Sequence, residues 1–267
     1  MITQKIYETY KFWFTNYVNK FIMEYPELSE NIEIKADHCW RVRKEIVGIS
    51  QNLKLNEEDS LLAETIALFH DVGRFKQYVK YQTFSDSKSQ NHAELGVEVL
   101  KENDVLKELA EEYKQIVYKS ILNHSRAEII PDDNEKVIHF SKLIRDADKL
   151  DIWRLITEYY MVKEESGENK TLELELPDSN EISEKVYEAI VNNKVVLKDS
   201  MKTLNDFKIL QIAWIFDLNF DYSIKQLFDK KYLDKIFDAL PENQKVNKIK
   251  EIVNKYFKNH IETLTYN

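Results

Sequence analysis

The chain contains a single cysteine, Cys39, among its 267 residues. One cysteine cannot form an intrachain disulfide, and it cannot supply the several thiolates of a cysteine-rich zinc site. The chain also has no basic excess, because 47 acidic side chains outnumber 38 basic ones and the formal net charge is −9. Proteins that bind nucleic acid mainly through phosphate contacts need a positively charged face. We therefore expect no stable nucleic-acid binding.

A long apolar run is also missing near the N-terminus. Charged side chains interrupt residues 1–23 at Lys5, Glu8, Lys11 and Lys20. This segment therefore lacks the unbroken apolar stretch that a signal peptide or a membrane helix requires. The chain as a whole is 43% hydrophobic and 32% charged, which is the composition of a globular protein. We expect a soluble, cytoplasmic protein that does not bind membranes.

Glycine and proline are scarce, with only four of each. Hairpins and tight turns depend on these residues, so their scarcity favours long helices. Apolar residues recur at three- and four-residue spacings through most of the chain, which is the period of a helix with one buried face. We predict an all-α fold, a bundle of helices. The expected helices cover residues 3–22, 32–52, 57–71, 91–103, 105–124, 134–163, 180–193, 203–216, 221–228, 231–240 and 243–263.

The helical period is interrupted at residues 163–177, which contain Gly167 and an alternating Leu/Glu run at 172–176. The alternation predicts one short strand or a hairpin arm. This is the best position for a domain boundary, although a surface loop within one domain is an equal alternative. We predict a helical core with its N-terminal helix at residues 1–165 and a C-terminal helical extension, packed on the core, at 166–267.

Polar side chains of metal-ligand type lie on the apolar stripes of five predicted helices. A single histidine in such a position is usually a hydrogen-bonded core residue. Several together need a different explanation, because these faces offer too few cationic partners and a buried unpaired polar group costs about 1–3 kcal/mol. A divalent cation would satisfy both imidazole and carboxylate. The candidate metal ligands are His38, His70, Asp71, His92, His124 and Asp148.

Six ligands exceed the three or four that one catalytic zinc takes from a protein, but they suit two cations that share a carboxylate. Adjacent residues on a helix diverge by about 100°, so His70 and Asp71 do not naturally converge on one point. A short carboxylate that gives one oxygen to each of two cations tolerates this divergence. We predict two divalent ions, whether iron, manganese, nickel, zinc or magnesium. The first would bind His38, His70, Asp71 and Asp148, and the second Asp71, His92 and His124.

Residues 73–90, which follow the His70-Asp71 pair, are polar and aperiodic. This pattern predicts a loop beside the site of chemistry. Arg74 and Lys76 in this segment are candidates for binding a substrate phosphate, and arginine offers two donors in a fixed geometry. A solvated surface position is the alternative for both side chains.

The ordered set of candidate ligands resembles the HD superfamily of metal-dependent phosphohydrolases, which is named for a doublet like His70-Asp71. The last ligand lies within Ala147-Asp148-Lys149-Leu150, and residues 92–96, His-Ala-Glu-Leu-Gly, resemble the second-metal segment of the binuclear branch. The resemblance covers about residues 30–160. It implies an all-helical fold, divalent metals and, most often, hydrolysis of phosphate esters or nucleotides.

The chain lacks most subfamily signatures. After His124 it reads Ser-Arg-Ala, without the second histidine and the Gly-Tyr-Pro segment of cyclic-dinucleotide phosphodiesterases. We predict a phosphohydrolase that uses a metal-bound hydroxide on a nucleotide or another small phosphate ester, with Asp71, Arg74 and Lys76 as catalytic residues. Glu94 and Asp146 are candidates for orienting the ligand imidazoles. A di-iron oxygenase and a non-catalytic nucleotide-sensing module are the alternatives.

Overall fold

The computed structural model describes residues 1–166, 173–174 and 176–265, and every regular element in these ranges is a helix. The predicted all-α fold is therefore confirmed. The chain divides into two compact units, Met1–Asp151 and Ile152–Asn267. None of the described helices is long and apolar enough to cross a membrane.

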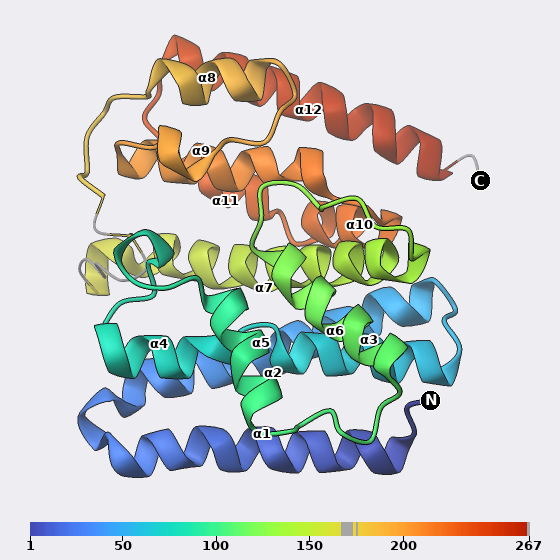
Figure 1. Ribbon diagram of the computed structural model, residues 1–267. Coiled ribbons are helices and arrows are strands. Elements are labelled where there is room, and N and C mark those ends of the chain that lie inside the picture. Colours follow the sequence, from blue (N-terminus) through green and yellow to red (C-terminus); the bar gives the residue numbers. More distant parts are fainter. Residues whose placement is uncertain (167–172, 175, 266–267) are drawn as a thin grey trace. The chain divides into compact units, whose positions relative to one another are not determined.

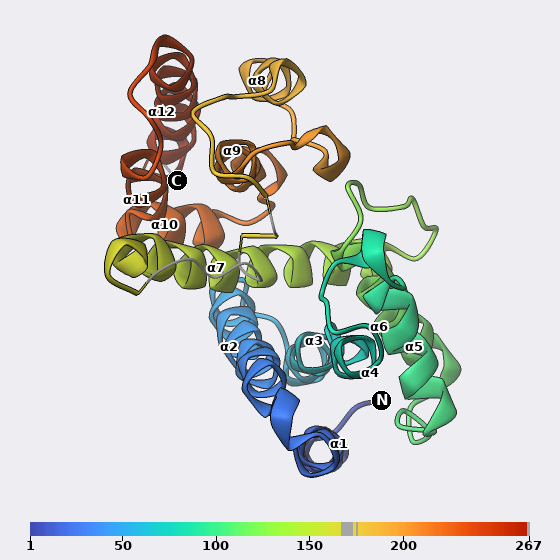
Figure 2. The same cartoon turned by 90° about the vertical axis from the view of Figure 1, so that its left-hand side faces the viewer.

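The first unit contains six complete helices and the first half of a seventh. In Figure 1, α1 runs along one edge of this unit, and Figure 2 shows α1 and α4 nearly end-on. Helix α2 packs along α3, and α4 packs along α5. The helices are α1 (Gln4–Glu24), α2 (Ser29–Asn52), α3 (Glu57–Phe69), α4 (Gly73–Tyr81), α5 (His92–Glu102), α6 (Glu111–His124) and α7 (Glu135–Ser166), with 3-10 turns η1 (Pro26–Leu28) and η2 (Asp86–Lys88).

An aromatic cluster fixes the C-terminal end of α3. The ring of Phe69, the last residue of α3, contacts Tyr10, Trp13 and Phe14 of α1, with ring centroids 5.8–6.5 Å apart. Phe14 and Phe69 are fully buried. Truncating a buried phenylalanine typically costs about 3–5 kcal/mol, so this contact holds the end of α3 firmly. The residue that follows Phe69 is His70, and the core thus fixes the backbone of the His-Asp doublet.

The second unit is also helical. Within it, α8 packs against α9 and α12, and α11 packs against α9. A capping box at Thr203 and Asp206 starts α9, and the Asp206 carboxylate also accepts hydrogen bonds from Ser183 just before α8. The elements are α8 (Glu184–Val191), η3 (Lys198–Ser200), α9 (Leu204–Ala213), η4 (Trp214–Asp217), α10 (Asp221–Asp229), α11 (Tyr232–Asp238) and α12 (Gln244–Thr265).

Two sequence predictions are corrected. The segment 73–90 is a loop only in its second half, because its first residues form α4. The polar composition of α4 conceals a buried face that includes Phe75, Gln77 and Tyr78. The helix expected at 105–124 begins only at Glu111, after a series of turns.

Two other predictions stay open. Residues 172 and 175 of the strand expected at 172–176 lie outside the described residues, while Glu173 and Leu174 form a turn and Leu176 belongs to no regular element. The predicted domain boundary after residue 165 stays a prediction, because helix α7 contributes residues to both compact units.

Candidate metal centre

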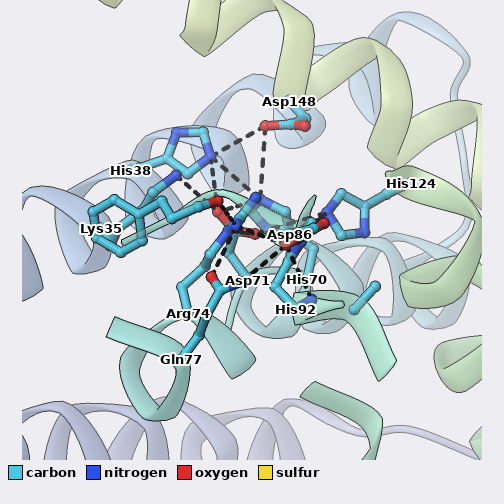
Figure 3. Close-up of polar contacts among 12 residues, drawn as sticks. Lys35, His38, His70, Asp71, Arg74, Gln77, Asp86, His92, His124 and Asp148 are labelled. Atoms are coloured by element: carbon cyan, nitrogen blue, oxygen red, sulfur yellow. Dashed lines mark hydrogen bonds and ion pairs between the residues drawn. The ribbon is translucent and has the colours of Figure 1, made fainter. Parts of the chain in front are cut away.

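The six predicted ligands lie together in the first unit, although they come from five parts of the chain. Figure 3 shows their side chains directed toward a common centre, with Asp71 between the others. Nearly all of them are buried, and only the Asp148 side chain keeps a larger exposed fraction, 17%. His38 lies on α2, and His70 and Asp71 lie in the turn after α3. His92 is the first residue of α5, His124 is the last residue of α6, and Asp148 lies on α7.

The His-Asp doublet lies in a turn rather than within a helix. Helix α3 ends at Phe69, residues 70–72 form a turn, and α4 begins at Gly73. The turn is tightened by hydrogen bonds of three-residue spacing, from the Val72 amide to the Phe69 carbonyl and from the Arg74 amide to the Asp71 carbonyl. This break lets two adjacent residues face the same centre, which a regular helix would prevent.

Two of the imidazoles are oriented by the backbone at helix ends. The Nδ1 atom of His70 donates to the Ala67 carbonyl at 2.7 Å, and the Nδ1 atom of His124 donates to the Ile121 carbonyl at 2.5 Å. The last carbonyls of a helix have no partner within the helix, so each histidine at a C-terminal end satisfies one of them. A carbonyl only accepts, which assigns the proton to Nδ1 and leaves Nε2 as a free acceptor.

The other two imidazoles are oriented by carboxylates. The Nδ1 atom of His38 lies 2.8 Å from Asp151, whose other oxygen accepts from Arg41. The Nδ1 atom of His92 lies 2.7 Å from Asp86. Carboxylates beside metal-binding histidines commonly fix the ring and its tautomer in this way. In all four histidines, Nδ1 is engaged and Nε2 points to the centre.

The free Nε2 atoms approach one another closely in pairs. They are 3.3 Å apart between His38 and His70, and 3.0 Å apart between His92 and His124. Two neutral imidazoles that both carry the proton on Nδ1 cannot form a hydrogen bond through Nε2, because both atoms are acceptors. Buried lone pairs facing each other are unfavourable unless a cation is shared between them. This donor set therefore fits a metal ion.

Asp71 presents one oxygen to each histidine pair. Its Oδ2 lies 3.7 Å and 3.8 Å from the Nε2 atoms of His38 and His70. Its Oδ1 lies 3.3 Å and 3.7 Å from those of His92 and His124. This arrangement supports the predicted bridge between two cations.

Asp148 completes the first group, because its Oδ1 lies 3.1 Å from the Nε2 atom of His38. Its Oδ1 is also 3.7 Å from the Nε2 atom of His70. The grouping is not exclusive, since ligand atoms of His70, His124 and Asp148 also lie within 4.8 Å of one another. The two groups therefore form one continuous cluster.

The charge states suit metal binding. Burial and the nearby charge of Arg74 lower the pKa of His92 to about 3, and burial also lowers the pKa of His124. Burial opposes ionisation of Asp71, but the charges of Lys35 and Arg74 outweigh it and hold its pKa well below the usual range. The second group is thus composed of neutral imidazoles and an ionised carboxylate at neutral pH, which are the forms that bind metals.

The first group differs in its response to protons. Burial and the charge of Lys35 oppose protonation of His38, but the carboxylates of Asp148 and Asp151 outweigh them and raise its pKa. Burial likewise opposes ionisation of Asp148, yet its close contacts with the imidazoles of His38 and His70 outweigh burial and hold its pKa well below the usual range. A proton therefore competes with a cation for the His38 Nε2 atom, and acid should weaken metal binding there.

A family model of the HD domain matches residues 36–153 of the chain. Residues 36–153 are an HD domain. All six clustered side chains, from His38 to Asp148, lie within it. HD-domain proteins include many metal-dependent phosphohydrolases. Comparisons with curated proteins and with solved structures found no match.

Only one of the two predicted phosphate-binding residues lies beside the cluster of candidate metal ligands. Arg74 is beside it, with its Nε atom 3.4 Å from Asp71 Oδ1, but its Nη1 atom donates to Gln77, to the Phe84 carbonyl and to Asp86. These contacts tie the segment after α4 to the site. Lys76 is not brought to the cluster, because its ammonium pairs with Glu102 at a side-chain exposure of 41%. Phosphate binding by either residue stays a prediction.

The sequence analysis missed four residues that surround the cluster of candidate metal ligands. Asp151 and Arg41 lie one helical turn beyond a ligand, so helical spacing was a usable signal for them. Asp86 precedes His92 by six residues in a serine-rich loop, and Lys35 precedes His38 by three. Glu94, the predicted partner of a ligand imidazole, is exposed, and it is Asp86 that holds His92. Asp146 is buried in α7.

We expect Asp86→Ala to weaken metal binding at the His92 group by about 10- to 100-fold, the range typical for a carboxylate that orients a ligand histidine. Asp86 also accepts hydrogen bonds from the His92 amide and from Gln77, so its loss frees both the ring and the loop. Isothermal titration calorimetry with the metal should show a weakened affinity for one ion and an unchanged affinity for the other. Ser87→Ala, an exposed change in the same loop, is the control. Two unchanged ions in Asp86→Ala would refute this role.

Proposed function

We propose that this protein is a metal-dependent phosphohydrolase that acts on a nucleotide or another small phosphate ester. The observation that carries the proposal is the convergence of four histidine Nε2 atoms on the two oxygens of Asp71. Two divalent cations held there would supply Lewis-acid chemistry, acidifying water and neutralising phosphoryl charge, so that no serine or cysteine nucleophile is needed.

The protein's own side chains prepare this site in two ways. Hydrogen bonds at all four Nδ1 atoms fix the imidazoles before any ligand arrives, which lowers the cost of ordering them. Burial removes competing water from all ligands except Asp148. Donors of the imidazole and carboxylate type suit iron, manganese, nickel and zinc, whereas magnesium prefers oxygen donors and water. We therefore favour a transition metal.

The charge balance of the cluster supports an anionic substrate. Among the described residues in ionic contact with the cluster, four carboxylates face three cationic side chains. Two divalent ions would therefore leave a strong net positive charge, which a phosphate ester complements and a neutral substrate does not. The charged side chains are Lys35, Arg41, Arg74, Asp71, Asp86, Asp148 and Asp151.

The test is a panel of nucleotides, phosphomonoesters and phosphodiesters, incubated with protein reconstituted with manganese, iron or nickel. We expect phosphate release or ester cleavage from at least one class, complete inhibition by a chelator, and recovery after metal is restored. Asp71→Ala protein purified in parallel controls for contaminating phosphatases.

Two results would contradict the proposal. Oxygen consumption by anaerobically purified, iron-containing protein without hydrolysis would favour the di-iron oxygenase. Tight nucleotide binding with no turnover under any metal would favour the sensing module.

A further inference from the structure

Lys35 is a cation at the edge of the metal cluster. It lies on α2, one helical turn before His38, and its Nζ atom is 3.1 Å from Asp71 Oδ2. Its side chain is 22% exposed, whereas that of Asp71 is 4% exposed. Figure 3 shows the ammonium beside the carboxylate that lies between the two histidine pairs. Lys35 therefore lies between solvent and the buried carboxylate of Asp71.

An aromatic ring holds this ammonium in place. The Nζ atom of Lys35 lies 5.4 Å from the centroid of the Phe84 ring, which is a cation–π contact. Phe84 in turn stacks on Tyr78 of α4, with ring centroids 4.5 Å apart. The position of the ammonium is thus defined from two sides, by the loop after α4 and by Asp71.

Lys35 has donors to spare, and it is less constrained than Arg74, the other cation at the same carboxylate. Arg74 uses its Nη1 atom on three acceptors, which fixes it to the loop. An ammonium has three N–H donors. In the described part of the chain, the ammonium of Lys35 donates a hydrogen bond to the Asp71 carboxylate. Lys35 can therefore bind a further anionic oxygen without breaking a structural contact.

We infer that Lys35 binds an anionic oxygen of the substrate's phosphoryl group and that the substrate is a phosphomonoester rather than a diester. This inference rests on the proposed phosphohydrolase function. A cation bound to Asp71 Oδ2 would share its charge, which would release the ammonium toward the substrate. A monoester carries up to two negative charges and a third non-bridging oxygen, so it gains more than a diester from a third cationic contact beside two divalent ions.

The experiment measures binding of inorganic phosphate to manganese-loaded protein by calorimetry. We expect Lys35→Gln to weaken phosphate binding about 10- to 100-fold, the effect of losing one hydrogen bond between charged groups. Lys35→Arg should retain most of the affinity, because it keeps the charge. Lys44→Gln, an exposed change on the same helix, is the matched control. Manganese content should stay at the wild-type value in all three variants.

Two outcomes would overturn the inference: equal phosphate affinity in Lys35→Gln and Lys44→Gln, or no phosphate binding by manganese-loaded wild-type protein. If the wild-type protein hydrolysed diesters and not monoesters, the assigned substrate class would also be wrong. The proposed function is tested separately by the hydrolysis panel. If the wild-type protein hydrolyses a substrate but Lys35→Gln leaves phosphate affinity unchanged, only the role of Lys35 is refuted. If phosphate binding depends on Lys35 but no substrate is hydrolysed, only the proposed hydrolysis is refuted.

Discussion

Asp71→Ala should bind neither cation tightly and should lose metal-dependent hydrolysis by at least about 10³-fold, as expected when a group central to transition-state stabilisation is removed. The two oxygens of Asp71 face different histidine pairs, at 3.3–3.8 Å from the four Nε2 atoms. Its removal therefore takes a ligand from both groups at once. Elemental analysis of the purified variant, together with the hydrolysis panel, checks this result.

Two comparisons make the Asp71→Ala result specific. Asp37→Ala makes the same substitution at an exposed position next to His38, and it should leave metal content unchanged. His92→Ala should remove the second cation and spare the first, because His92 contacts only the Oδ1 side of Asp71. If Asp71→Ala kept two ions, the bridge would be refuted. If His92→Ala lost both ions or neither, the division of ligands between two groups would be wrong.

The sequence predicted the helices well where a periodic pattern carried the information. The stripe of Ile34, His38, Val42, Ile46 and Ile49 is confirmed as a buried face of α2 except at its first residue, because Ile34 is exposed. The same reasoning identified the other candidate ligands, because a polar side chain on an apolar stripe is conspicuous, and all of these except Asp148 are buried. Their role as metal ligands stays a prediction, which the geometry supports.

Features without a periodic pattern escaped prediction. The turn at residues 70–72 contains no glycine or proline that would have indicated it in the sequence. Asp86 acts through a contact across a loop, and such a loop has no fixed spacing to its partner. Lys35 resembles any solvated lysine until the fold places Asp71 and Phe84 beside it.

Gly73→Ala should disrupt the site although Gly73 is not a ligand. Replacing glycine by alanine normally stabilises a helix by about 1 kcal/mol. Gly73 opens α4 and is buried against α5. A methyl group added there would lie 2.2 Å from the carbonyl oxygen of His92 and 2.5 Å from the amide nitrogen of Gly96. Both are backbone atoms, so no side-chain rotation relieves the overlap and the two helices must move apart.

Because His92 is the first residue of α5, this separation would carry its ring away from His124 and Asp71. We expect Gly73→Ala to reduce the free energy of unfolding by about 1–3 kcal/mol, as overpacked cores do. We also expect it to lose the second cation while the His38 group keeps the first. Thermal unfolding and elemental analysis measure the two effects separately.

Gly96→Ala is the matched control, because it alters the same helix contact from the other side. There the nearest atoms to an added methyl group are the Gly73 nitrogen at 3.3 Å and a methyl carbon of Val72 at 3.4 Å. Small adjustments relieve such distances, and the helical preference for alanine offsets their cost. Gly96→Ala should therefore keep both cations and a near-normal stability. Equal behaviour of the two variants would mean that α4 does not hold His92 in place, and that the cluster depends on its hydrogen bonds alone.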